Sequence, residues 1–192
     1  MINKQQMRTD YRLLREGLDP SVRADFNSRV FKNLRQVLAS LSGVKIIAGY
    51  SYMHGEIDLA DFSQELQKSG YLLALPVVCK AFNPLKFCAL TKDTILHTTK
   101  YNIIEPVYSS ALEVAPDIIL TPLIACDRTG NRLGFGKAFY DITISHLRAL
   151  KPIVAIGLAY HFQVADFIPS EPHDAQLDII VTNHGAIYPP RV

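Results

Sequence analysis

The chain reads Asp117-Ile-Ile-Leu-Thr-Pro-Leu-Ile-Ala125 and, after three further residues, Thr129-Gly-Asn-Arg-Leu-Gly-Phe-Gly-Lys-Ala-Phe-Tyr-Asp141. The first stretch is apolar and rich in β-branched residues, which is typical of a buried strand. The second is glycine-rich, which is typical of a loop. An amphipathic run follows and predicts a helix over residues 137–150, with apolar side chains at Ile142, Ile144, Leu147 and Leu150. The order strand, glycine loop, helix favours an α/β fold.

The glycine loop has the composition of a phosphate site. Glycines let the backbone approach a ligand and direct N–H groups toward it, and a helix start adds partial positive charge. Arg132 and Lys137 add full charges, and Asp141 could hold the metal ion that accompanies phosphate. The three glycines are Gly130, Gly134 and Gly136.

A geometric turn between a strand and a helix explains the same glycines. The Walker A pattern is absent, and G-x-G-x-x-G is not completed because Phe139 stands at its last position. On the local pattern alone, the phosphate site and the plain turn are about equally supported.

The composition bounds the class of protein. A length of 192 residues predicts one domain, and 48% hydrophobic with 20% charged residues predicts a folded core. A net charge of +2 and the lack of a basic, aromatic-rich stripe argue against a nucleic-acid partner. The three cysteines form no CxxC pair, and we see neither a signal peptide nor a membrane span, so we expect a cytoplasmic protein.

Apolar periodicity places the other elements. We expect helices over residues 3–17, over 20–41 after the Asp19-Pro20 cap, and over 59–68 after Asp58. Continuous apolar runs predict strands at 44–50, 71–78, 87–90, 117–121, 153–159 and 178–182, with a long loop containing extended pieces at 92–116. Buried strands alternating with helices predict a three-layer α/β/α open, mostly parallel sheet, with ligands beyond the carboxyl ends of its strands.

Other charged residues form candidate sites, each with a plainer alternative. Lys4 and Arg8 share a helix face and could grip a polyphosphate, although a solvated face explains them better. Glu56 follows a strand and could accept hydrogen bonds from a heterocycle, or be a surface acid. Asp174 and Asp178 could help to hold Mg²⁺, or start a turn.

Taken together, these segments resemble the 5-formyltetrahydrofolate cyclo-ligase family over nearly the whole chain. The most specific match is D-x-x-G-x-R-L-G-x-G-K-G-x-Y-D, here Asp127 to Asp141. Weaker matches in the family's order are Lys4-Gln-Gln-Met-Arg8, Tyr50 to Asp58, Leu75 to Val78, Glu105-Pro106, Gly157 to Gln163, Pro169 to Asp174 and Asp178 to Thr182.

The resemblance implies an ATP- and Mg²⁺-dependent enzyme that converts 5-formyltetrahydrofolate to 5,10-methenyltetrahydrofolate and releases ADP and phosphate. The formyl oxygen would take the γ-phosphoryl group, N10 would attack the activated carbon, and phosphate would leave. The implied partners are small molecules, with no nucleic acid or membrane, and the protein would be a monomer or homodimer.

The resemblance also implies residue roles. Asp141 and Asp174 would hold Mg²⁺, and Arg132 and Lys137 would be catalytic at the transferred phosphate. The residues implied to bind ATP are Lys4, Arg8, Arg132, Leu133, Gly134, Phe135, Gly136, Lys137, Ala138, Phe139 and Tyr140. Those implied to contact the folate are Ser51, Glu56, Phe135, Phe139 and Tyr140.

The chain departs from the family pattern at Ala138, where the family usually has glycine. Alanine is harmless if this residue begins the helix, but costs about 1 kcal/mol if its φ is positive. Two rival functions remain open: a non-catalytic folate or nucleotide binder whose loop has drifted, as Ala138 would suggest, and a sugar-phosphate or acyl-CoA enzyme on a similar sheet, which needs only one anion site. For the latter, Lys4, Arg8 and Asp174 would be dispensable.

Overall fold

The computed structural model describes residues 3–100 and 103–190. Three of its α-helices, α1, α2 and α3, begin beside a residue whose side chain caps the first turn. The Asn3 side chain accepts hydrogen bonds from the first turn of α1, Asp19 does the same for α2, and Asp58 accepts one from the Ala60 N–H. The α-helices are α1 (Lys4–Glu16), α2 (Pro20–Ser40), α3 (Ala60–Lys68) and α4 (Phe139–Leu150).

The main sheet has seven strands in the order β12-β11-β9-β6-β1-β2-β3. The five strands from β11 to β2 are parallel, and antiparallel β12 and β3 lie at the two edges. The prediction of a mostly parallel sheet is therefore confirmed. The strands are β1 (Ile46–Ala48), β2 (Leu72–Val77), β3 (Lys86–Ala89), β6 (Ile118–Thr121), β9 (Val154–Leu158), β11 (Ile179–Thr182) and β12 (Gly185–Ile187).

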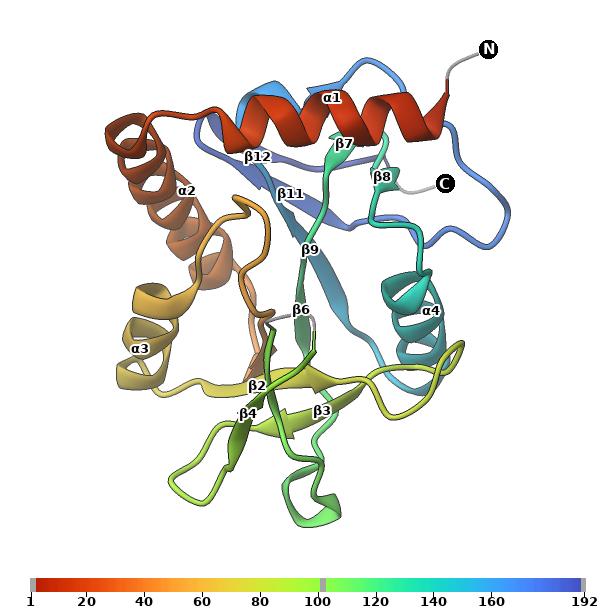
Figure 1. The fold of residues 1–192 in the computed structure, drawn as a ribbon. Helices are drawn as coiled ribbons and strands as arrows, with labels where there is room; N and C mark the ends of the chain where they lie inside the picture. The colour runs from red at the N-terminus through yellow and green to blue at the C-terminus, as the bar shows by residue number, and fades with distance from the viewer. Residues whose placement is uncertain (1–2, 101–102, 191–192) are drawn as a thin grey trace.

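Helices cover both faces of this sheet, which gives three layers (Figure 1). Alternate strand residues face opposite layers, because successive side chains point to opposite sides of a strand. Ile47 and Ile118 belong to the core shared with α2 and α3, whereas Ala48 and Ile119 belong to the core shared with α4. Burial on both faces explains the continuous apolar strands in the sequence.

The sheet changes direction between β1 and β6. The chain runs from β1 to β2 on one side, and later places β6, β9 and β11 on the other. In open α/β sheets this switch point, beyond the carboxyl ends of the strands, is where ligands bind. The segment carrying Glu56 follows β1 and the glycine loop follows β6, so both leave the sheet at this edge.

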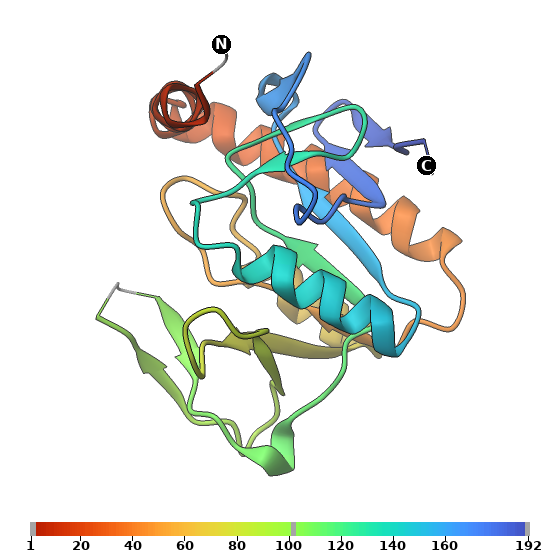
Figure 2. The same cartoon turned by 90° about the vertical axis from the view of Figure 1, so that its right-hand side faces the viewer.

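Two smaller sheets were not predicted. The order β10-β7-β8 joins Val164–Ala165, Ala125–Asp127 and Arg132–Leu133 beyond the carboxyl end of β6, where α1 packs on it through Met7 and Tyr11. The β4–β5 hairpin (Leu96–Thr98 and Ile104–Pro106) lies within the expected long loop and projects beside β2 and β3 (Figure 2). Short 3-10 turns, η1 (Ser110–Leu112) and η2 (His161–Gln163), complete the elements. Within the described ranges, no helix is both long and apolar enough to cross a membrane.

Candidate active site

The glycine loop makes a tight turn and then enters α4. Gly130 has φ +90°, and a Cβ added there would lie 2.7 Å from the Leu177 carbonyl oxygen, so a side chain does not fit. Gly136 has φ +85°, and Ala138 has φ +53° as the N-cap of α4. Of the two possibilities for Ala138, the structure has the strained one: this alanine occupies the left-handed region at the helix start.

Asp127 holds the start of the loop in shape. Its buried carboxylate accepts hydrogen bonds from the backbone N–H groups of Thr129, Asn131 and Ile168. Burial raises the pKa of this carboxyl, but the hydrogen bonds from Thr129, Ile168 and Asn131 lower it by more. The pKa of Asp127 is therefore below its ordinary value. Asp127 is thus a structural anion, and it fixes where the glycine segment begins.

The middle of the loop presents open backbone donors. No residue in the two described ranges accepts a hydrogen bond from the N–H of Gly134, Phe135 or Gly136. The next element, α4, has no side-chain cap at Ala138, so its first N–H groups are not satisfied by a capping side chain. Adjacent open N–H groups at the positive end of a helix form a site for an anion such as phosphate.

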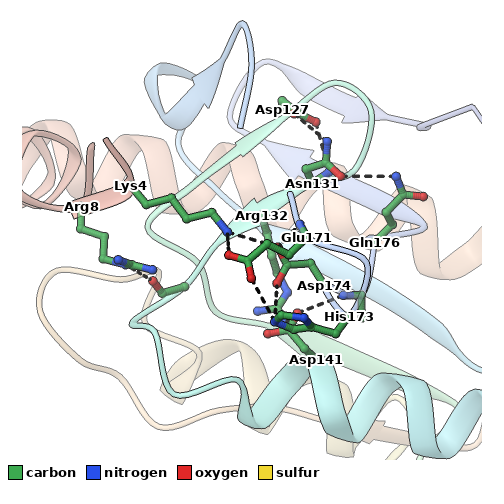
Figure 3. Close-up of polar contacts among 12 residues, drawn as sticks. Lys4, Arg8, Asp127, Asn131, Arg132, Asp141, Glu171, His173, Asp174 and Gln176 are labelled. Carbon is green, nitrogen blue, oxygen red and sulfur yellow. Dashed lines mark hydrogen bonds and ion pairs between the residues drawn. The ribbon is translucent and has the colours of Figure 1, made fainter. Parts of the chain in front are cut away.

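Helix α1 brings two cations to this loop, as Figure 3 shows. Arg8 Nε donates to the Gly134 carbonyl at 2.9 Å, and its guanidinium lies against Gly136. Lys4 Nζ lies 2.9 Å from Glu171 and 3.4 Å from Asp174. Burial lowers the pKa of Lys4, but its pairing with Glu171 and Asp174 outweighs this, and the pKa is raised. Of the helix face predicted to grip phosphate, Arg8 therefore contacts the glycine loop, whereas Lys4 contacts the neighbouring segment that carries Glu171 and Asp174.

Arg132 lies inside the protein. Its Nη2 donates to Asp141 Oδ1 at 2.5 Å, and the two side chains are only 5% and 16% exposed. The guanidinium also lies over the Tyr140 ring. Leu133 is 1% exposed, so only its backbone can meet a ligand. Lys137, in contrast, is exposed at the end of the loop.

The carboxylates near the loop do not form a metal cage on their own. Among the described residues, no three His, Cys, Asp or Glu side chains group as metal ligands. Mg²⁺ is usually held by one or two carboxylates together with phosphate oxygens and water, and Asp141 and Asp174 fit that pattern because both lie beside Arg132 (Figure 3). The expectation for Asp178 is wrong: this residue lies immediately before β11, at the opposite end of the sheet, where it accepts a hydrogen bond from the Ala155 N–H and pairs with Arg148.

Glu56 is buried across the switch point from the loop. It is 4% exposed, and its Oε2 accepts from the Met53 N–H at 3.0 Å. Burial raises its pKa to about 7, and Arg15 and the Met53 hydrogen bond oppose that rise. The surface-acid alternative for Glu56 is therefore wrong.

Aromatic residues and Ser51 lie between these two halves. Phe135 is half-exposed, with its ring centroid 6.0 Å from that of His54, in the turn before Glu56. Phe139 and Tyr140 are half-buried and pack against the core beneath α4. Ser51 donates to the Ile104 carbonyl and so ties the β1 segment to the hairpin. A hollow of about 330 Å³ opens between α1 and the loop, lined by Gln5, Arg8, Thr9, Arg12, Leu13, Glu16, Ile124 and Phe135.

A family model described as the 5-formyltetrahydrofolate cyclo-ligase family matches residues 1–183. The chain belongs to the 5-formyltetrahydrofolate cyclo-ligase family. A cyclo-ligase of Haemophilus influenzae is 33% identical over 186 residues, which cover 93% of this chain and 97% of that protein. A cyclo-ligase of Saccharomyces cerevisiae is 27% identical over 210 residues, covering 98% and 99%.

A solved structure agrees with this cyclo-ligase assignment, and a second one shows the same fold. The NMR structure of Aquifex aeolicus 5,10-methenyltetrahydrofolate synthetase superposes with a TM-score of 0.81 at 28% identity and covers 100% of this chain and 95% of its own. The Mycoplasma pneumoniae 5,10-methenyltetrahydrofolate synthetase has the same fold, with a TM-score of 0.74 at 23% identity over 95% and 99% of the two chains.

Within this cyclo-ligase fold, one buried residue at the switch point had no assigned role. Arg15 of α1 is 1% exposed and donates to the His54 and Leu123 carbonyls. In the sequence it is one of several cations on the first helix, and an exposed helix face explains it equally well. The position of Arg15 in the sequence does not indicate its burial, because the carbonyl groups that accept its hydrogen bonds are 39 and 108 residues away.

Proposed function

We propose that this chain cyclises 5-formyltetrahydrofolate to 5,10-methenyltetrahydrofolate, using ATP and Mg²⁺ and releasing ADP and phosphate. The observation that carries the proposal is the open glycine loop at the uncapped start of α4, facing Arg8, in a chain that matches the cyclo-ligase family from residue 1 to residue 183. A plain turn needs neither open N–H donors nor a cation held against them.

The loop side of the switch point binds the triphosphate in this proposal. The N–H groups of Gly134, Phe135 and Gly136 hold phosphate oxygens, and α1 adds the charges of Lys4 and Arg8. Lys137 stands next to the helix start and neutralises charge on the transferred group. Arg132 has an indirect role. Its buried ion pair with Asp141 fixes the backbone before and after the open N–H groups of the loop.

The β1 side binds the reduced folate. The carboxylate of Glu56 is suited to accept hydrogen bonds from the N–H groups of the pterin, because an ionised carboxylate is acceptor-only. Phe135, on the open rim, offers an aromatic surface to the folate or the nucleotide, and Ser51 lies beside the same segment. Phe139 and Tyr140 support this surface from beneath, since they pack on the core.

Asp141 and Asp174 would hold Mg²⁺ together with the nucleotide. When bound, the ion supplies positive charge that offsets the negative charge of the phosphates. In the absence of nucleotide, Arg132 and Lys4 balance these two carboxylates. Binding of the ion requires Lys4 to turn from Asp174 to the phosphates, which a flexible lysine side chain permits.

The reaction proceeds in two transfers. The oxygen of the formyl group on N5 attacks the γ-phosphorus of ATP. The bond between this phosphorus and the β–γ bridging oxygen breaks, and ADP leaves. N10 then attacks the activated formyl carbon, the carbon–oxygen bond breaks with loss of phosphate, and the N10 proton passes to solvent. The protein contributes mainly position and charge: it holds the pterin at Glu56 and the phosphate at the loop so that oxygen and phosphorus meet.

The protein would work on small molecules in the cytoplasm, as a monomer or homodimer, without nucleic-acid or membrane partners. Its three cysteines, Cys79, Cys88 and Cys126, are free thiols, in keeping with a reducing compartment.

An absorbance assay tests the proposed function. Purified protein is mixed with 5-formyltetrahydrofolate and Mg²⁺, and the near-ultraviolet band of methenyl-folate is followed with and without ATP. We expect the band to grow only with ATP. Folate binding by calorimetry without turnover would replace the proposal by a non-catalytic binder, and the absence of both would favour a sugar-phosphate or acyl-CoA enzyme.

A further inference from the structure

Arg15 joins the two segments that border the switch point. Its Nε donates to the His54 carbonyl after β1, and its Nη1 donates to the Leu123 carbonyl after β6, both at 2.9 Å. The side chain is 1% exposed. A single arginine from α1 therefore fixes the relative position of the folate side and the phosphate side.

The third nitrogen of Arg15 is not used by these contacts. Nη2 is buried and has no hydrogen-bond partner among the described residues. A buried N–H donor without a partner lowers the stability of the folded state. Two hydrogen bonds to backbone carbonyls do not by themselves require a charged guanidinium group. The uncommitted positive charge therefore calls for an explanation beyond packing.

The charge of Arg15 interacts electrostatically with Glu56, an acid that is 4% exposed. Arg15 makes no ion pair within 4.0 Å with any acid of the described ranges, so its charge acts on Glu56 through space and not through a direct pair. Charges separated in this way still interact strongly, because little water screens them. Because Arg15 and Glu56 form no direct ion pair, the carboxylate remains able to pair with a ligand.

We propose that Arg15 is a positioning residue for folate binding: its positive charge favours the ionised form of the buried Glu56 carboxylate, and its contacts hold the turn that carries Glu56. This inference rests on the proposed role of Glu56 in binding the reduced folate. A direct ion pair would instead consume the carboxylate oxygens that the pterin needs.

Other groups around Glu56 do not supply the same charge. Tyr50, at the end of β1, and Tyr140, on α4, both interact with Glu56, and burial raises the pKa of each phenol, so both are neutral near pH 7. His54 lies in the same turn, and its ring faces Phe135 and Glu16. Among the described residues that act on Glu56, Arg15 supplies the positive charge.

The charge can be tested without any activity. Carboxyl-labelled glutamate is introduced, the Glu56 signal is assigned by its loss in Glu56→Gln, and its midpoint is measured by ¹³C NMR titration. Arg15→Met is expected to raise the midpoint by about one pH unit or more relative to the unaltered chain, because the opposing charge is gone. An unchanged midpoint in folded Arg15→Met would overturn the proposal.

Arg23→Met is the matched control. Arg23 holds the same turn through the Gly55 carbonyl at 2.9 Å and the Arg15 carbonyl at 2.8 Å, but it is not among the groups that act on Glu56. It is expected to leave the Glu56 midpoint in place. An equal shift in both methionine variants would mean that the turn, and not the charge, sets the midpoint, and would overturn the proposal.

Kinetics connect the charge to folate binding. Near pH 7, Arg15→Met is expected to raise KM for 5-formyltetrahydrofolate about tenfold, with partial recovery at higher pH and a much smaller change in KM for ATP. Arg15→Lys keeps the positive charge and should therefore leave the Glu56 midpoint unchanged. If Arg15→Met does not fold, this lysine variant tests the proposal instead. A rise of about one pH unit in the Glu56 midpoint of Arg15→Lys would overturn the proposal. If the unaltered chain forms no methenyl-folate, the proposed function fails, while the titration still decides whether Arg15 controls Glu56.

Discussion

Arg132 Nη2 lies 2.5 Å from Asp141 Oδ1, and the same oxygen accepts a hydrogen bond from the Ala175 N–H at 3.0 Å. One carboxylate therefore connects the strand before the glycine loop, the helix after it and the segment that follows Asp174. Because both side chains are largely buried, removing either charge would leave the other buried without its partner.

Asp141→Ala should therefore damage both stability and turnover. We expect a loss of about 3 to 5 kcal/mol in the free energy of unfolding, because Arg132 is left buried without its partner. Urea unfolding measures this loss. Asp141→Asn keeps an acceptor for Ala175 and should lose less, and adding Arg132→Met to Asp141→Ala should restore stability. Additive effects of the two substitutions would contradict the coupling.

Lys137→Ala should abolish turnover and leave stability unchanged. The side chain is exposed on the loop, so its removal costs little in folding, whereas a missing charge at a transferred phosphate costs at least about 100-fold in kcat. Activity and thermal unfolding are measured on the same preparation. Near-normal turnover would remove Lys137 from the phosphate site.

Arg8→Ala should raise KM for ATP about tenfold, with little change in KM for folate, because it removes a charged donor held against the loop. Lys4→Ala should act in the same direction. Lys32, exposed on α2, is the control position, and its alanine variant should behave like the unaltered chain. Equal ATP kinetics in all three variants would favour the single-anion-site alternative.

Ala138→Gly should stabilise the protein by about 1 kcal/mol, because glycine adopts φ +53° without the clash that alanine suffers. Chemical denaturation gives the difference. Ala24→Gly, at an exposed position within α2, is the opposite control and should destabilise by about 1 kcal/mol. A loss of stability at both positions would mean that the loop alanine is not strained.

Glu56 should make stability depend on pH. Its pKa rises from 4.5 in the unfolded chain to about 7 in the folded one, so the folded state binds the extra proton between these values. Its contribution to stability is full below pH 4.5 and is lost as pH rises through about 7, a change of about 3 kcal/mol. Unfolding of Glu56→Gln across this range should lack that slope, and parallel curves for the two proteins would refute the raised pKa.

The sequence predicts the main layers well, since they depend on local patterns. Apolar periodicity and capping residues placed α1, α2 and α3 within two residues of their observed ends, and continuous apolar runs located the parallel strands. The smaller sheets escaped because strands such as Val164–Ala165 are too short to show alternation and exist only through distant pairing. The edge strand β12 was missed for the same reason.

The site was predictable where chemistry is concentrated in one segment. The glycine loop, with Arg8 and Lys4 beside it, came from residue types and from the family resemblance. The burial of Arg132 and Glu56 could not be read from the sequence, because burial of a charge is decided by what packs over it. Asp178 was correctly expected at the start of a strand but wrongly grouped with Asp174 near the phosphate loop, because the start of a parallel strand lies at the end of the sheet away from the ligands.

Helix α1 is synthesised before the glycine loop and the segment that carries Asp174, yet its Lys4 contacts Asp174, 170 residues later. During synthesis the proposed phosphate site is therefore complete only after the segment around Asp174 has emerged, and a nascent chain that stops before this segment would lack a completed place for a nucleotide. A nucleotide held by both α1 and the glycine loop would fasten this helix to the rest of the protein, so a ligand at the proposed site would protect α1 from proteases.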